Sequence, residues 1–362
     1  MRRVAAAALE QHQCKNAEPR GNDLNFASKY LLTCAFFCAI TPVLHAQNNE
    51  SPERLPRSIL DVRPPSERVQ GNPGALRVID RSCRALPLEQ VRRRIVDTAV
   101  QEWAYFGYST DLQAREITQQ ETGPRRPFVY PRMTPAEGER LATSIAGYWA
   151  ATPNSDWIVQ RQNAAWSESG MGARWRDAWS AAFISWVMCE GGLADNNQFK
   201  RAIAHHSYID QAIVASDTQD PVAAYRAYPL GVQTIVPGDL LCRGSRPAYR
   251  SIEERRAQLG VGARTHCDIV VSVDERNEQI TVVGGNVRAT VRMKIMPATK
   301  DADSPMRPIA DNGRALFAHL QLQAPEIEAT ALANSPSLTC APNETTPPAL
   351  ALVLEAKPTT SC

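Results

Sequence analysis

The chain has 362 residues, of which 43% are hydrophobic and 22% charged, so it can bury one core of ordinary size and still carry tails. Its formal net charge is only +2, because 40 Lys and Arg residues are matched by 38 Asp and Glu residues. This balance excludes the strongly basic composition typical of proteins that bind nucleic acids or adhere to membranes. We therefore expect one main domain, no nucleic-acid partner, and a function defined by a local site.

Residues 1–46 have the layout of a secretory signal peptide, with a polar start, an apolar run at residues 30–44 and Ala46 at the cleavage position. The run is shorter than the roughly 20 residues that span a bilayer, so we expect export without a stable membrane anchor. The long polar start also allows a true translation start after Met1. A lipoprotein cleavage before Cys34 is the weaker alternative, since the apolar run continues beyond it.

The segment 47–80 is polar, rich in Pro and Arg and without an apolar period, which predicts an exposed linker. From Leu88 onward apolar residues recur at three- and four-residue steps, which predicts an amphipathic helix that ends near Gly107. Residues 110–133 lack periodicity and are expected to form a surface loop.

A second helix is predicted from the capping box Thr134-Pro-Ala-Glu, in which an N-cap threonine is followed by a first-turn proline and a glutamate. A third helix should begin near Asp177 as N-cap and end at a pair of glycines, Gly191 and Gly192. A fourth is expected over residues 197–215. Helices therefore dominate the first half of the chain.

The second half contains short β-branched runs bounded by turn residues at 236–242, 267–273 and 279–283. These predict a small antiparallel sheet behind the helices, with further strands near 288–296 and 314–322. Residues 322–362 are rich in Ala, Pro and Thr, and we expect a mostly disordered tail. The main domain is thus predicted as an α+β domain over residues 82–321.

Ser180 is the candidate nucleophile because an N-cap at Asp177 would place it in the first helical turn, beside unpaired N–H groups and the positive end of the helix dipole. The structural alternative is that serine occurs in first turns as an ordinary capping residue. His266 is the candidate general base, since strand alternation puts His266 and Asp268 on one face and Cys267 on the other. Asn286 could orient the imidazole.

Six cysteines follow residue 46, an even number that permits disulfide bonds in an exported protein. Antiparallel pairing of their strands would bring Cys242 and Cys267 opposite each other, so we predict a disulfide there. The alternative that Cys267 is itself a nucleophile is weak, because its side chain points away from that of His266. A metal site from His205, His206, His266 and Asp268 has no recognised spacing, and we expect no metal and no cofactor.

Five motifs together resemble the bacterial domain of unknown function 2272, over about residues 82–321. They are residues 179–186 (WSAAFISW), 204–208 (AHHSY), 237–240 (PGDL), 266–270 (HCDIV) and 284–287 (GGNV). This resemblance implies no established activity.

A more distant resemblance is to the CHAP-type amidohydrolases and peptidases, papain-like domains that cut peptidoglycan peptides. Residues 179–186 are similar to their W-C-A-A-F helix, His266 to their strand histidine and Asn286 to their third polar residue. The resemblance implies a papain-like α+β fold and a site in which Trp179, His205 and Tyr208 help to bind a cell-wall peptide or glycan. Ser180 stands where these enzymes have cysteine, which puts ordinary thiol catalysis in doubt.

Three hypotheses follow. The first is an exported hydrolase of cell-envelope amide bonds, with Ser180 as nucleophile, His266 as base and Asn286 or Asp268 as the residue that orients it. The second is a catalytically silent papain-like module that binds a cell-wall peptide, glycan or protein partner in the same cleft. The third is a structural envelope protein whose cleft is vestigial.

Overall fold

The computed structural model describes residues 52–113, 134–170, 174–301, 304–311 and 314–340. The chain divides into two units, Met1–Asn49 and Glu50–Cys362, and the described residues belong to the second. The predicted signal peptide, residues 1–46, lies outside the described residues. No helix in the described ranges is both long and apolar enough to cross a membrane.

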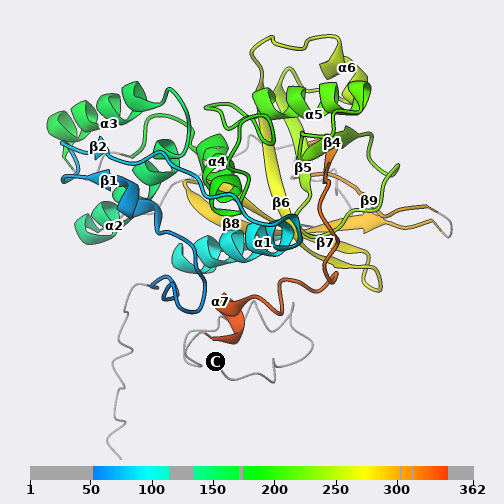
Figure 1. The fold of residues 1–362 in the computed structure, drawn as a ribbon, viewed down its shortest axis with the longest axis horizontal. Helices are drawn as coiled ribbons and strands as arrows, with labels where there is room; N and C mark the ends of the chain where they lie inside the picture. Colours follow the sequence, from blue (N-terminus) through cyan, green and yellow to red (C-terminus); the bar gives the residue numbers. More distant parts are fainter. Residues whose placement is uncertain (1–51, 114–133, 171–173, 302–303, 312–313, 341–362) are drawn as a thin grey trace, which may run out of the picture. The chain divides into compact units, whose positions relative to one another are not determined.

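A single large sheet organises the described unit, with strand order β3-β8-β7-β6-β5-β10-β4 and β9 paired to β8 (Figure 1). Neighbouring strands are antiparallel except for β3 and β8, which are parallel. The α+β class predicted from the sequence is confirmed, but the sheet is larger than the small one expected. The strands are β3 (Thr110–Leu112), β4 (Tyr225–Tyr228), β5 (Leu240–Arg246), β6 (Arg264–Asp274), β7 (Gln279–Val287), β8 (Thr290–Thr299), β9 (Arg307–Pro308) and β10 (Leu316–Leu322).

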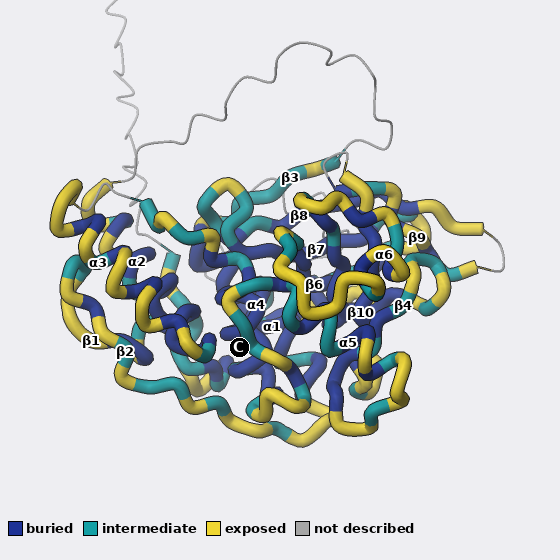
Figure 2. The backbone as a smooth tube through the Cα atoms, turned by 90° about the horizontal axis from the view of Figure 1, so that it is seen from above, coloured by how far each residue is buried: buried dark blue, intermediate teal, exposed yellow. Residues whose placement is uncertain are grey.

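Two helices, α1 (Leu88–Tyr105) and α4 (Ser180–Glu190), pack on one face of this sheet (Figure 1). Nearly every residue of α4 is buried, and Figure 2 shows both helices within the buried interior. Gly285 of β7 permits the close approach of α4, because a Cβ atom there would lie 2.5 Å from the Cβ of Phe183. The central strands and α4 thus form the core of the domain.

Helices α2 (Pro135–Ala150) and α3 (Asp156–Ser169) lie at one side with the short hairpin β1 (Val69–Gln70) and β2 (Arg77–Val78) (Figure 1). The start of α2 agrees with its predicted capping box, since Thr134 Oγ accepts a hydrogen bond from the Glu137 backbone N–H at 3.2 Å. The sequence did not predict α3.

The prediction of an exposed linker over residues 47–80 is wrong for the part that the structure describes, because this part packs on the main domain. Leu60 and Val62 are buried in the main core, and Arg54 forms a buried ion pair with Glu102 of α1. The 3-10 helix η1 (Pro65–Arg68) packs so closely on α2 that a Cβ atom at Gly147 would collide with the Pro65 backbone. These contacts are not periodic along the chain, so the pattern of apolar residues did not reveal them.

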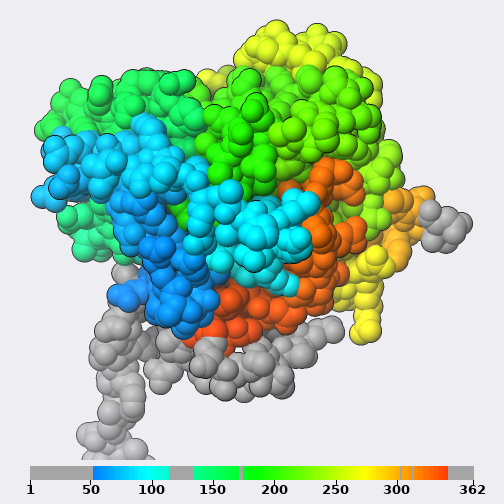
Figure 3. Space-filling view, in the orientation of Figure 1, coloured from blue at the N-terminus to red at the C-terminus, as the bar shows by residue number. Residues whose placement is uncertain are grey.

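The prediction of a disordered tail over residues 322–362 is wrong for its first part, which is ordered on the domain. Residues 323–340 lie against the sheet and α1 and include the short helix α7 (Pro336–Thr339), as the orange and red surface in Figure 3 shows. Leu332 is buried, and its backbone N–H donates to the carbonyl of Val271 at 3.0 Å. Backbone pairing with β6 therefore orders a segment that has few large apolar side chains.

At the opposite edge of the sheet α5 (His206–Thr218) packs along β4 and against α6 (Ile252–Arg256). This helix starts nine residues later than predicted, since residues 197–205 form turns. Two disulfide bonds join described cysteines, Cys83 to Cys189 and the predicted pair Cys242 to Cys267. Such bonds are typical of proteins in oxidising compartments outside the cytosol.

Candidate functional site

Ser180 is the first residue of α4 and is partly exposed. The prediction that Asp177 is the N-cap of this helix is wrong, because Trp179 occupies that position. Asp177 instead forms an ion pair with Arg161 of α3. The first helical hydrogen bond runs from the Phe183 N–H to the Trp179 carbonyl at 2.9 Å. The N–H groups of the first turn before Phe183 therefore have no partner within the helix, and Ser180 lies among them.

The hydroxyl of Ser180 is hydrogen-bonded to His205, with 2.7 Å between Oγ and Nε2. His205 is 3% exposed and lies directly before α5. Its other ring nitrogen, Nδ1, faces the backbone N–H of Cys267 at 3.2 Å and the hydroxyl of Tyr208. Of the predicted binding residues, His205 thus contacts the predicted nucleophile directly, and Tyr208 contacts the His205 ring.

These partners fix the protonation of His205. A backbone N–H can only donate, so Nδ1 must accept and the ring proton must sit on Nε2. Burial, with the charge of neighbouring His266 adding to it, holds the pKa of His205 well below its usual value, so the ring is neutral. Nε2–H therefore donates to Ser180 Oγ, and His205 has no free lone pair with which to remove the serine proton.

His266 belongs to a second polar cluster. Its Nε2 lies 2.9 Å from Asp268 Oδ1, and the other oxygen of Asp268 accepts from Lys294. Lys294 also lies 2.9 Å from Asp311, which is paired with Arg243. His266, Asp268, Lys294 and Asp311 are buried, and the side chain of Arg243 is 15% exposed. Burial alone would raise the pKa of Asp268, but His266 and Lys294 outweigh it and hold that pKa well below its usual range.

The His266–Asp268 pair lies on the face of the sheet away from Phe183 of α4. Consecutive glycines of β7 show this: a Cβ atom on Gly284 would meet Asp268 and His266, whereas one on Gly285 would meet Phe183 of α4. The His205 ring nevertheless lies close to this pair, 5.1 Å from the His266 ring between centroids. No hydrogen bond joins Ser180 to His266 among the described residues.

Among the described residues no hydrogen bond joins Asn286 to His266, whose Nε2 faces Asp268 instead. The Asn286 backbone has φ +56°, in the left-handed region that asparagine tolerates better than most residues. Asn286 instead lines a cavity of about 250 Å³ at the start of α4. Three tryptophans share this Trp-lined cavity, whose wall consists of Gly138, Leu141, Ala142, Ile145, Trp166, Arg174, Trp175, Arg176, Asp177, Ala178, Trp179, Asn286 and Ala289.

Cys267 is bonded to Cys242 and is fully buried, so the alternative that it acts as a free thiol nucleophile is wrong for this structure. The disulfide fixes Cys267 against β5, and the same residue's N–H holds His205. In the part of the chain that is described, no three or more His, Cys, Asp or Glu side chains gather in a way that would hold a metal ion.

Sequence reasoning missed Lys294 and Asp311, although one signal was present. Lys294 is a lone cation between Met293 and Ile295 in a strand that is buried along most of its length, and such a charge must be paired to be tolerated. The contact between His205 and Tyr208 also had a signal in the sequence. The two residues are three positions apart at the start of α5, and this spacing puts both side chains on one side of the first turn.

Comparisons with known proteins give one match. The model of a family described as "Uncharacterized protein conserved in bacteria (DUF2272)" matches residues 137–321, which run from the first turn of α2 into β10 and include all the site residues above. No curated protein and no solved structure matches the chain.

Proposed function

Since the chain belongs to the uncharacterized bacterial family DUF2272, we propose its function from the site itself: an exported papain-like module that binds a cell-wall peptide or glycan without cleaving it. Ser180 and the Trp-lined cavity beside it form the binding site. The likeness of residues 179–186 to the first helix of CHAP-type domains supports the papain-like fold and the cell-wall ligand.

One observation carries the proposal: His205 donates its Nε2 proton to Ser180 Oγ, because its Nδ1 accepts from the Cys267 backbone. A neutral serine is a poor nucleophile unless a base takes its proton during attack. In this arrangement one lone pair of the serine oxygen accepts from His205, no base takes the serine proton, and that proton can be donated to a ligand. Ser180 is therefore built as a hydrogen-bond donor.

The surroundings of Ser180 suit a carboxylate or carbonyl oxygen of a bound peptide. The unpaired N–H groups of the first turn of α4 and the helix dipole both favour a negatively charged oxygen there. The indole faces of the adjacent cavity and the amide of Asn286 offer apolar contact and hydrogen bonds to a peptide or sugar. The disulfide bonds support export to the compartment where such ligands occur.

Amide hydrolysis is the second candidate, favoured by the His266–Asp268 pair. A buried carboxylate that accepts from one ring nitrogen leaves the other available as a base, which is the arrangement of a catalytic triad. For this reaction Ser180 would have to exchange its contact with His205 for one with His266.

Sedimentation with purified peptidoglycan separates these candidates. The wild type should co-sediment without releasing soluble fragments. Ser180→Cys should gain no cleavage activity, because the His205 imidazole that contacts position 180 presents its N–H and not a lone pair. Trp175→Ala, which removes an indole from the cavity wall, should weaken binding about tenfold. The matched control is Trp157→Ala, an exposed tryptophan of α3 outside the cavity, which should bind like the wild type.

Fragment release by the wild type that Ser180→Ala abolishes would establish the hydrolase instead. Absence of any binding by the folded wild type would remove both candidates for this ligand.

A further inference from the structure

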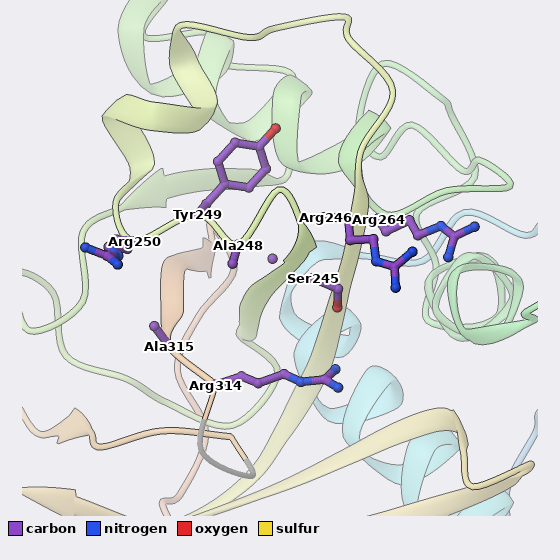
Figure 4. A pocket seen from close by; sticks show the side chains of 9 residues that line it. Ser245, Arg246, Ala248, Tyr249, Arg250, Arg264, Arg314 and Ala315 are labelled. Carbon is purple, nitrogen blue, oxygen red and sulfur yellow. The ribbon is translucent and has the colours of Figure 1, made fainter.

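A second cavity, of about 580 Å³, lies at the far end of strand β5 (Figure 4). Its wall combines the end of β5, the loop that follows, the first residue of β6 and the chain before β10. Basic side chains predominate among its residues, which are Gly244, Ser245, Arg246, Ala248, Tyr249, Arg250, Arg264, Arg314 and Ala315. No acidic residue lines this arginine pocket.

The arginines of the pocket differ from their neighbours in their ion pairing with the described residues. Nearby Arg243, Arg255 and Arg256 are each paired with an aspartate. By contrast, none of the four arginines in the wall forms an ion pair with a carboxylate of the described residues, although Glu254 accepts a hydrogen bond from the backbone N–H of Arg250 at 2.8 Å. In a chain whose net charge is only +2, this is a local concentration of uncompensated positive charge.

Two of these arginines are held beside each other by the sheet. Arg246 and Arg264 are directly paired in the β5–β6 ladder, where side chains of like charge repel. Figure 4 shows Arg246, Arg264 and Arg314 extending to the side of the pocket where Ser245 lies, whereas Arg250 points to the opposite side. A bound anion would turn the repulsion among the three into attraction.

The floor of the pocket is rigid. A Cβ atom at Gly244 would lie 2.6 Å from the Pro247 carbonyl oxygen and 2.7 Å from the Tyr249 nitrogen, so only glycine lets the loop fold back on β5. Tyr249 is buried against Phe317, and its hydroxyl accepts from Arg255 at 3.0 Å and donates to Gln258 at 2.8 Å. The loop that follows Arg246 is therefore fixed before any ligand arrives.

We propose that the arginine pocket binds a ligand with phosphate groups that carries at least two negative charges. The planar guanidinium group presents paired N–H donors that match the oxygens of a phosphate, and three such groups on one side can hold two phosphates. The ligand is either a soluble phosphorylated molecule or a phosphate-bearing lipid headgroup. This site is independent of the one at Ser180.

Calorimetric titration of the full chain with inorganic pyrophosphate tests the proposal. The wild type should bind, with an affinity that falls as salt is added. Arg246→Gln and Arg314→Gln should each weaken binding about tenfold, the effect of losing one charge-assisted hydrogen-bonding group. The matched control is Arg276→Gln, which removes the same charge from the exposed turn at the opposite end of β6 and should bind like the wild type.

Flotation with vesicles that contain cardiolipin, whose headgroup carries two phosphates, compared with phosphatidylcholine vesicles, distinguishes the two sources. Binding to the anionic vesicles that requires Arg246 and Arg314 identifies a headgroup, and pyrophosphate binding alone identifies a soluble ligand. No pyrophosphate binding by the wild type, or equal losses in Arg276→Gln and Arg246→Gln, would overturn the proposal. Loss of peptidoglycan binding would leave it unaffected.

Discussion

The position of one proton on the His205 ring determines whether Ser180 can act as a nucleophile. The Cys267 N–H fixes the acceptor nitrogen of His205, and burial keeps the ring neutral, so the proton on Nε2 must point at the serine. The same histidine with its proton on Nδ1 would be a general base. The backbone N–H of Cys267 therefore determines that His205 donates to the Ser180 hydroxyl and does not accept its proton.

Lys294 is the residue on which the second cluster depends. It lies between Asp268 and Asp311, and replacing it by methionine would leave two buried carboxylates short of a counter-ion. We predict that Lys294→Met lowers the free energy of unfolding by about 3–5 kcal/mol in urea denaturation. Lys300→Met, which breaks an exposed pair with Glu275, should cost less than about 1 kcal/mol. Similar losses in both variants would contradict the role given to Lys294.

Part of this site could be predicted from residues close together in the sequence. The first-turn position of Ser180 and the Cys242–Cys267 pair follow from local helix and strand patterns. The contact between Ser180 and His205 does not, since it joins two helices through side-chain placement in three dimensions. For the same reason the sequence offered Asn286 and Asp268 as equal partners of His266, and only the packing distinguishes them.

Among the secondary-structure elements, α1 and α2 were predictable because each has a strong apolar period, and α2 also has a cap. No comparable signal marks α3, because it has few buried positions and one of them is the polar residue Gln162. The segment 323–340 was also missed, since its order comes from packing on α1 and from backbone pairing with β6. Tertiary contacts of this kind leave little trace in composition.

The packing of that segment on α1 buries Asp97, whose Oδ1 has no hydrogen-bond partner among the described residues. Burial raises the pKa of Asp97 to about 7 from its ordinary 3.8. The folded state therefore holds this proton more tightly than the unfolded state, so the resulting stability is complete below about pH 4 and is lost as the pH rises towards 7.

We predict that Asp97→Asn flattens this decline and is more stable than the wild type at pH 8, by an amount up to about 4 kcal/mol. Urea denaturation between pH 4 and pH 8 measures it. Asp156→Asn, at an exposed position that pairs with Arg81, should retain the decline of the wild type. A wild type whose stability is constant or increases over this range would contradict the assignment to Asp97.

At the scale of the whole molecule, the two disulfides that join described cysteines close loops of different length. Cys83–Cys189 spans 106 residues and ties the chain before α1 to the end of α4, whereas Cys242–Cys267 spans 25 residues within one strand pair. Loss of the longer connection restores more freedom to the unfolded chain. The double variant Cys83→Ala/Cys189→Ala should lose about 4–5 kcal/mol and Cys242→Ala/Cys267→Ala about 3–4 kcal/mol in urea denaturation. The reverse order would show that native-state packing, rather than chain entropy, dominates.

The protonation of His205 can be observed directly by long-range ¹H–¹⁵N NMR of the histidine-labelled protein, with His205→Gln used to assign its signals. We predict a neutral ring at pH 7 with its proton on Nε2, unchanged in the Ser180→Ala variant. A ring that carries its proton on Nδ1, or on both nitrogens, would contradict the account, because His205 would then be arranged as the base or acid of a catalytic serine.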